Sequence, residues 1–257
     1  MDLSSAQLGA WVGGFMWPFM RIGAMLMANP VFGSRSVPVR VRIIITLVLT
    51  LVVAPHLPDL PDVDVLGSQG LLISVHEVLI GLTLGFTMQL VFAAFVMAGD
   101  YIANAMGLGF ASMVDPVNGV NVPIISQFLL ILTFLLFFCF GGHALLIEVL
   151  VTSFVAIPVG LPDIQPERAL LVAGWASRMF GMAVLVSIPV VACLLLVYVA
   201  LGVMTRAAPQ LNIFSVGFPL TILAGFVALI LALPAVGDRF SSALLLGMDL
   251  SREILGG

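Results

Sequence analysis

The sequence predicts an all-helical membrane protein, and its composition and its long apolar stretches support that fold class. Of its 257 residues, 61% are hydrophobic and only 9% are charged, and the mean hydropathy is +1.24. A water-soluble domain has about a quarter charged residues and just under half apolar ones. A globule of this size lacks the interior to hide so much apolar surface from water. A lipid bilayer or a tightly packed membrane assembly must therefore solvate the remainder.

Six apolar stretches carry the prediction of helices: residues 8–28, 43–54, 71–99, 123–158, 169–204 and 213–236. A spanning helix needs about 20 apolar residues, so most of the stretches qualify, whereas 43–54 needs its flanks. Because unsatisfied backbone groups are forbidden in hydrocarbon, we expect helices rather than open strands. Kinks are expected at Pro18, Pro189 and Pro219, and a break in the fourth stretch at Gly141-Gly142-His143.

The charges of the first two loops predict an orientation in the membrane. Residues 33–42 hold three arginines and no acid, while residues 55–70 hold three aspartates and neither lysine nor arginine. The arginine bias predicts a cytoplasmic first loop and an external second loop. No basic segment precedes the first apolar stretch, so we expect no cleaved signal peptide.

Ionisable residues interrupt the apolar stretches, and each is expected to face protein, a pore or water. They are Arg21, His76, Glu77, Asp100, His143, Glu148 and Arg178. His76-Glu77 and His143/Glu148 either relay protons or join helices, with Glu148 and Arg178 as one expected pair. Small residues recur at four-residue spacing in two series, at Gly81 and Gly85 and at Gly99, Ala103 and Gly107. The spacing either lets helices approach closely or arises by chance among 25 glycines.

The loop of residues 106–122 carries the most information about function. Its glycines, its proline and its Asn118-Gly119 pair disfavour a continuous helix. It is nevertheless too apolar for a freely solvated loop, because Asp115 is its single charge. Non-helical backbone at membrane depth persists only where it is buried in protein or lines an aqueous cavity. The loop is therefore either a constriction or plug, with bulk from Phe110 and Met113, or an ordinary turn packed on helix ends.

The sequence lacks the motifs of common catalytic sites. It contains no G-x-x-x-x-G-K-[ST], no H-E-x-x-H and no G-x-S-x-G. Three histidines and two cysteines lie far apart, so we expect no metal and no cofactor. Cys139 and Cys193 are expected to be small buried hydrophobic residues rather than a disulfide. The net charge of −4 argues against a nucleic-acid partner.

Several blocks of sequence resemble the FliR family (FliR/SctT) of type III secretion export-gate subunits. They are RIG at 21–23, NPVFGSRSVPVR at 29–40, EVLIG at 77–81 with GF at 85–86, GGH at 141–143, SF at 153–154 with IP at 157–158, and ALGVMTRAAPQLNIFSVGFP at 200–219. The blocks occur in the family's order and extend over nearly the whole chain. Together they are specific, although each alone is weak.

The resemblance implies a single export-gate subunit over residues 1–257, built of kinked helical hairpins. A FliP-like part, about residues 1–165, precedes a FliQ-like part, about residues 166–257. The implied partners are FliP-type and FliQ-type subunits, FlhA/FlhB-type export proteins, membrane lipid and unfolded flagellar subunits as cargo. The implied location is the bacterial inner membrane and flagellar basal body, with the assembled gate largely on the periplasmic side.

The resemblance also assigns the family's plug loop to residues 106–122. The implied plug or pore set is Met106, Gly107, Gly109, Phe110, Met113 and Gly119, in which the glycines let the loop swing aside. The expected buried polar set is Arg21, Glu77, His143, Glu148, Arg178 and Arg206. We expect no catalytic residue.

Two alternatives remain open at this point. An injectisome export-gate subunit fits the last block equally well, although the first block favours the flagellar version. An ion-coupled small-molecule transporter is suggested by His76, Glu77, Glu148 and Arg178 in apolar stretches. Transporters of that kind usually contain internal repeats, and the sequence shows no convincing one.

Overall fold

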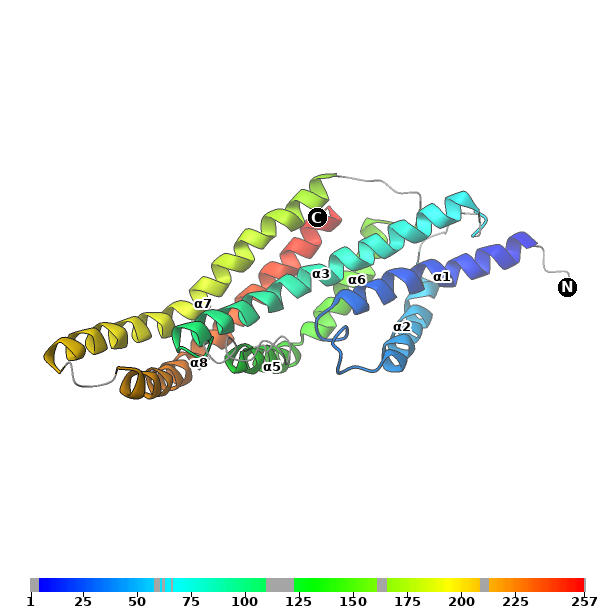
Figure 1. Cartoon of the computed structure of the whole chain (residues 1–257). Coiled ribbons are helices and arrows are strands. Elements are labelled where there is room, and N and C mark those ends of the chain that lie inside the picture. Colours follow the sequence, from blue (N-terminus) through cyan, green and yellow to red (C-terminus); the bar gives the residue numbers. More distant parts are fainter. Residues whose placement is uncertain are drawn as a thin grey trace. The chain divides into compact units, whose positions relative to one another are not determined.

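The computed structural model describes residues 5–57, 61, 63–65, 67–109, 123–160, 166–208 and 213–256. Within these residues every regular element is helical and none is a β-strand (Figure 1). The elements are α1 (Ser5–Ala28), α2 (Val39–Val53), the short 3-10 helix η1 (Ala54–His56), α3 (Ser68–Ala105), α5 (Ile124–Cys139), α6 (Gly142–Ala156), α7 (Pro166–Ala207) and α8 (Ile213–Leu255). The predicted all-helical fold class is confirmed.

Among the described residues, four helical segments are long and apolar enough to cross a membrane: Val39–His56, Ser68–Ala105, Glu167–Ala207 and Ser215–Leu255. Helices α5 and α6 make a fifth candidate if they are counted as one broken span, since they are bent by 69°. The break lies at Gly141, whose φ of 69° is a left-handed conformation that glycine adopts without steric cost. The predicted interruption of the fourth apolar stretch is therefore confirmed.

The last helix is longer than its apolar stretch predicted. Helix α8 does not end near residue 236 but continues to Leu255, with Pro219 and Pro234 inside it. Beyond Pro234 the buried residues Phe240, Ala243 and Leu244 keep a helical spacing, although Asp238 and Arg239 interrupt the hydropathy. Hydropathy averaged along the sequence does not predict this amphipathic end, because the average combines residues of the polar face of the helix with those of its apolar face.

The helices form two compact units, each built from distant parts of the chain. Unit 1 contains Met1–Leu90, Gly141–Trp175 and Leu245–Gly257, and unit 2 contains Val91–Phe140 and Ala176–Leu244. Helices α1, α2 and α6 thus belong to unit 1 and α5 to unit 2, whereas α3, α7 and α8 contribute to both. The division of the chain into a FliP-like part and a FliQ-like part stays a prediction.

The core of unit 2 is a cluster of aromatic rings. The ring of Phe240 in α8 packs edge-on against Phe92 and Phe95 of α3, at centroid distances of 5.6 and 5.3 Å. Phe137 of α5 lies 5.7 Å from Phe92. Such pairs are worth about 0.5–1.5 kcal/mol beyond the area that they bury. The cluster therefore holds α3, α5 and α8 together.

The two cysteines correct a prediction. Both are free thiols, and both are exposed on the isolated chain rather than buried. They lie on apolar helices whose outer faces this chain leaves uncovered, so their apolar neighbours did not imply burial within a single subunit.

Candidate functional site

The first candidate site is an ion pair in the interior of unit 1. The guanidinium of Arg21 in α1 donates two hydrogen bonds to the carboxylate of Glu77 in α3, from Nε to Oε2 at 2.6 Å and from Nη2 to Oε1 at 2.8 Å. Both side chains are 0% exposed. A bidentate, charge-assisted pair of this kind fixes orientation as well as distance. It therefore sets how α1 and α3 meet.

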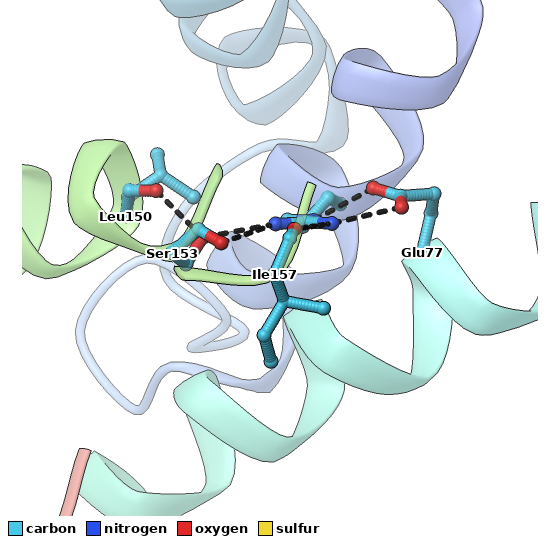
Figure 2. A network of polar contacts seen from close by, with 5 residues as sticks. Glu77, Leu150, Ser153 and Ile157 are labelled. Atoms are coloured by element: carbon cyan, nitrogen blue, oxygen red, sulfur yellow. Dashed lines mark hydrogen bonds and ion pairs between the residues drawn. The ribbon is translucent and has the colours of Figure 1, made fainter. Parts of the chain in front are cut away.

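The remaining donors of Arg21 reach the end of helix α6. Nη1 donates to the carbonyl oxygen of Ser153 at 2.8 Å and to its Oγ at 3.3 Å, and Nη2 donates to the carbonyl oxygen of Ile157 at 2.9 Å. In Figure 2, Glu77 lies on one side of the network and Ser153 on the other, with Ile157 drawn between them. The last carbonyls of a helix lack partners within the helix and favour a cation. Arg21 therefore joins three helices at one point.

The phenyl ring of Phe154 completes this arginine network, which we define as Arg21, Glu77, Ser153, Phe154 and Ile157. The guanidinium carbon of Arg21 lies 4.2 Å from the centroid of that ring. Contact with an aromatic face stabilises a desolvated cation. Both carboxylate oxygens of Glu77 are occupied by Arg21, so the network is organised for holding helices together rather than for binding an ion.

Helices α1 and α3 also approach closely at the first predicted pair of small residues. A Cβ atom at Gly81 would collide with the carbonyl oxygen of Arg21, and one at Gly85 would lie 2.5 Å from the carbonyl oxygen of Met25. These obstacles are backbone atoms and cannot rotate away. In the second series, a Cβ atom at Gly99 would collide with the Cα of Ser126 in α5. The spacing therefore reflects helix packing and not chance.

The turn after α1 accounts for part of the first sequence block. The side chain of Asn29 is fully buried, and its Oδ1 accepts a hydrogen bond from the backbone N–H of Val31 at 2.9 Å. The N–H of Gly33 donates to the carbonyl oxygen of Asn29 at 2.7 Å. A Cβ atom at Gly33 would collide with the carbonyl oxygen of Met27. Asparagine and glycine are thus needed here for a tight turn.

The second candidate site is the start of the predicted plug loop, in unit 2. Here α3 ends, and its last carbonyls need partners. The hydroxyl of Tyr198 in α7 donates to the carbonyl oxygen of Ala105 at 2.8 Å. The single proton of Thr221 Oγ1 in α8 is shared between the carbonyl oxygens of Phe218 at 3.0 Å and Met106 at 3.3 Å. The side chain of Met106 is 0% exposed. We call Ala105, Met106, Tyr198, Thr221 and Gly225 the loop anchor.

Glycine has a specific role on either side of this loop anchor. Gly107 has a φ of +82°, which L side chains rarely adopt, and lies against the ring of Phe218. A Cβ atom at Gly225 would lie 2.5 Å from Cγ of Met106. Met106, Gly107 and Gly109 are therefore described, whereas the predicted plug residues Phe110, Met113 and Gly119 lie outside the described residues.

We expect the substitution Gly225→Ala to destabilise the loop anchor by about 1–3 kcal/mol, because it overpacks the fully buried Met106. Thermal unfolding of the purified assembly measures this loss. In the double variant Gly225→Ala/Met106→Ala, the loss of stability should be smaller than the sum of the losses in the two single variants, since the smaller side chain makes room for the new methyl group. Strictly additive losses would show that Met106 and Gly225 are not packed together.

Four residues of the expected buried polar set are exposed on the isolated chain: His143, Glu148, Arg178 and Arg206. Glu148 contacts Arg252 of α8 at 3.4 Å rather than the expected Arg178. Both side chains of that pair are more than half exposed. This chain alone does not cover these residues, because position in an apolar stretch does not show which face of a helix the chain itself covers. Their burial in the assembly stays a prediction.

Sequence reasoning missed several residues of the two sites. Ser153 was recognised only as part of a block, and Tyr198 and Thr221 carry no motif that marks them as partners of the end of α3. Asp100 accepts a hydrogen bond from Ser126 Oγ, which joins α3 to α5. Hydroxyl groups in apolar stretches were the available signal, because each needs a partner in a nonpolar setting.

The fold and the two sites define an integral membrane protein whose polar groups organise helices. In the part of the chain that the structure describes, no three His, Cys, Asp or Glu side chains are grouped to hold a metal ion. Comparison with known proteins gives the particular family. Residues 12–246 match the family of bacterial export proteins, family 1.

Named relatives agree with this family. The chain is similar to the flagellar biosynthetic protein FliR of Pectobacterium carotovorum, with 40% identity over 236 residues, which are 92% of this chain and 90% of that protein. It is similar to FliR of Escherichia coli, with 36% identity over the same shares. FliR of Bacillus subtilis is 32% identical over 244 residues, 94% of each chain. The chain therefore belongs to the FliR family of bacterial export proteins, non-enzymatic components of flagellar protein export.

Proposed function

We propose that this chain is the subunit that closes the export channel, with residues 106–122 as its plug. The observation that carries the proposal is the loop anchor. Side chains from α7 and α8 satisfy the end of α3, and Gly107 then turns the chain out of the helix. A plug needs such a fixed origin, because a loop whose first residues moved freely would not close a pore reproducibly.

We further propose that FliP-type and FliQ-type subunits cover the outer helix faces. In the most apolar window of α3, 61% of residues are buried, against 28% in α7 and 22% in α8. Large apolar side chains such as Leu196 and Leu231 are 73% and 76% exposed. Lipid could cover these alone, but Arg178 and Arg206 of α7 are also exposed and are costly against hydrocarbon. Protein neighbours or water therefore suit these faces better.

The same proposal gives the location and the cargo. The assembly lies in the bacterial inner membrane and the flagellar basal body, largely on the periplasmic side, with FlhA/FlhB-type proteins nearby. Unfolded flagellar subunits pass through it. The flagellar names of the relatives favour this system over an injectisome.

An ion-coupled transporter is the weaker candidate. It needs a carboxylate that can exchange partners with an ion during transport. Glu77, the fully buried carboxylate among its suggested residues, has both oxygens held by Arg21. Glu148 is exposed beside Arg252. The arginine network therefore favours a structural role.

Deletion of residues 107–122 tests the plug directly. We expect the assembly to form but the inner membrane to become permeable to ions and small molecules, because nothing then fills the passage. Entry of a small chromogenic substrate into intact cells measures the leak, and co-purification measures assembly. A shorter deletion of residues 111–121 keeps the loop anchor and should give the same leak. A tight membrane with a fully assembled complex would refute the assignment.

A further inference from the structure

A cavity in unit 1 shares one lining residue, Ile157, with the arginine network and none with the loop anchor. Its volume is about 620 Å³, within the range of about 300–1,000 Å³ that is typical of ligand sites. Its lining is mostly apolar and comes largely from α3 and the first turns of α7, and it includes Leu79, Thr83, Phe86, Arg168, Val172 and Ile254. Both helices are long and apolar enough to cross a membrane.

One cation lies in this apolar setting. Arg168 is half-buried, and within the described residues it forms no ion pair with a carboxylate. Its neighbour Glu167 is exposed and does not line the cavity. Arg168 lies in the first turn of α7, and arginines near the ends of membrane helices reach toward the lipid headgroups. A half-buried guanidinium beside an apolar cavity is stabilised when an anionic ligand enters that cavity.

We propose that this cavity binds an anionic phospholipid, with one acyl chain against the apolar lining and the phosphate on Arg168. Such a ligand combines the two properties that the cavity requires, a long apolar part and a single negative group at one end. Guanidinium groups bind phosphate through paired hydrogen bonds, which favours arginine over the point charge of lysine at this position. The lipid would fill the space between α3 and the start of α7, and its role is independent of the plug.

The test measures lipid bound to the purified assembly. Dioleoylphosphatidylglycerol is titrated into the detergent-solubilised complex, and bound lipid is counted by native mass spectrometry. We expect Arg168→Gln to weaken binding about fivefold, the contribution of one arginine near a lipid surface. The matched control is Arg239→Gln, which removes an exposed arginine of α8 that does not line the cavity and should leave binding unchanged. Equal affinity in the wild type and Arg168→Gln overturns the proposal.

Two further arms identify what occupies the cavity. Thr83→Trp fills the apolar part and should abolish binding while Arg168 is retained, whereas glycerol phosphate at millimolar concentration should not compete with the lipid. Competition by glycerol phosphate would mean that the site takes a free anion. A photo-reactive amino acid at Leu79 should yield lipid adducts in cells. Adducts with another export protein instead of lipid would show that a partner segment occupies the cavity, and would contradict the proposal.

Discussion

Substitution of Glu77 by leucine is expected to lower the free energy of unfolding by about 3–5 kcal/mol, because it leaves the fully buried guanidinium of Arg21 without its counterion. Arg21→Leu should act similarly, since it leaves the carboxylate of Glu77 and the carbonyl oxygen of Ile157 unsatisfied. The double variant Arg21→Leu/Glu77→Leu removes both charges and should recover a large part of the loss. The amount of protein in the membrane and the thermal stability of the purified assembly measure these effects.

An exposed ion pair of the same unit provides the matched control. Arg252→Leu breaks the contact with Glu148, in which both side chains are more than half exposed. Pairs of this kind contribute about 0–1 kcal/mol, so this variant should accumulate normally. If Glu77→Leu were as stable as Arg252→Leu, the arginine network would not be what holds α1, α3 and α6 together.

Substitution of Gly81 or Gly85 by leucine should separate α1 from α3. The added atoms meet carbonyl oxygens of α1 rather than movable side chains, so the helices themselves must shift. The shift would also stretch the hydrogen bonds between Arg21 and Glu77, one helical turn from Gly81. We expect alanine to cost about 1–3 kcal/mol and leucine to prevent assembly, as measured by thermal unfolding and co-purification.

Gly237→Ala is the control for this effect. A Cβ atom at Gly237 meets nothing within 4 Å, although this residue also lies inside a long helix. Replacing a helical glycine at an open position with alanine should stabilise the helix by about 0.5–1 kcal/mol. If Gly237→Ala prevented assembly and Gly81→Leu did not, close packing of α1 against α3 would not explain the glycine at position 81.

The helices were predictable because apolar stretches of spanning length have few structures available to them. The break at Gly141 was predictable too, since two glycines and a histidine interrupt an otherwise apolar run. The end of α8 was not, because Asp238 and Arg239 lower the local hydropathy while Phe240 and Leu244 continue the buried face. Hydropathy averaged over a long sequence window therefore predicts that a helix is present better than it predicts the residues at which the helix ends.

The sites were predictable only in part. Arg21 and Glu77 could be recognised as costly charges, but sequence could not pair them, because 56 residues separate the two positions. The same reasoning predicted that His143 and Arg178 are buried, but this chain alone leaves both side chains exposed. Charges in apolar stretches show that some neighbour is required, but not whether it belongs to the same chain. The missing information is which side chains of partner subunits contact these charges.

The loop anchor illustrates a different limit. The turn at Gly107 was expected from the glycines of the loop, yet the partners Tyr198 and Thr221 come from helices far along the chain. The sequence does not show which carbonyl oxygen will accept a hydrogen bond from a given hydroxyl side chain. Only the fold brings these side chains to the carbonyls that α3 leaves unsatisfied.

Mild-detergent purification of the tagged chain, followed by a reconstruction of the particle, tests the central claim most directly. The account predicts a hetero-oligomer in which FliP-type and FliQ-type helices cover the exposed faces of α7 and α8, and in which residues 106–122 lie across a central passage. A stable monomer or homo-oligomer, with those faces bare or covered only by copies of itself, would contradict it.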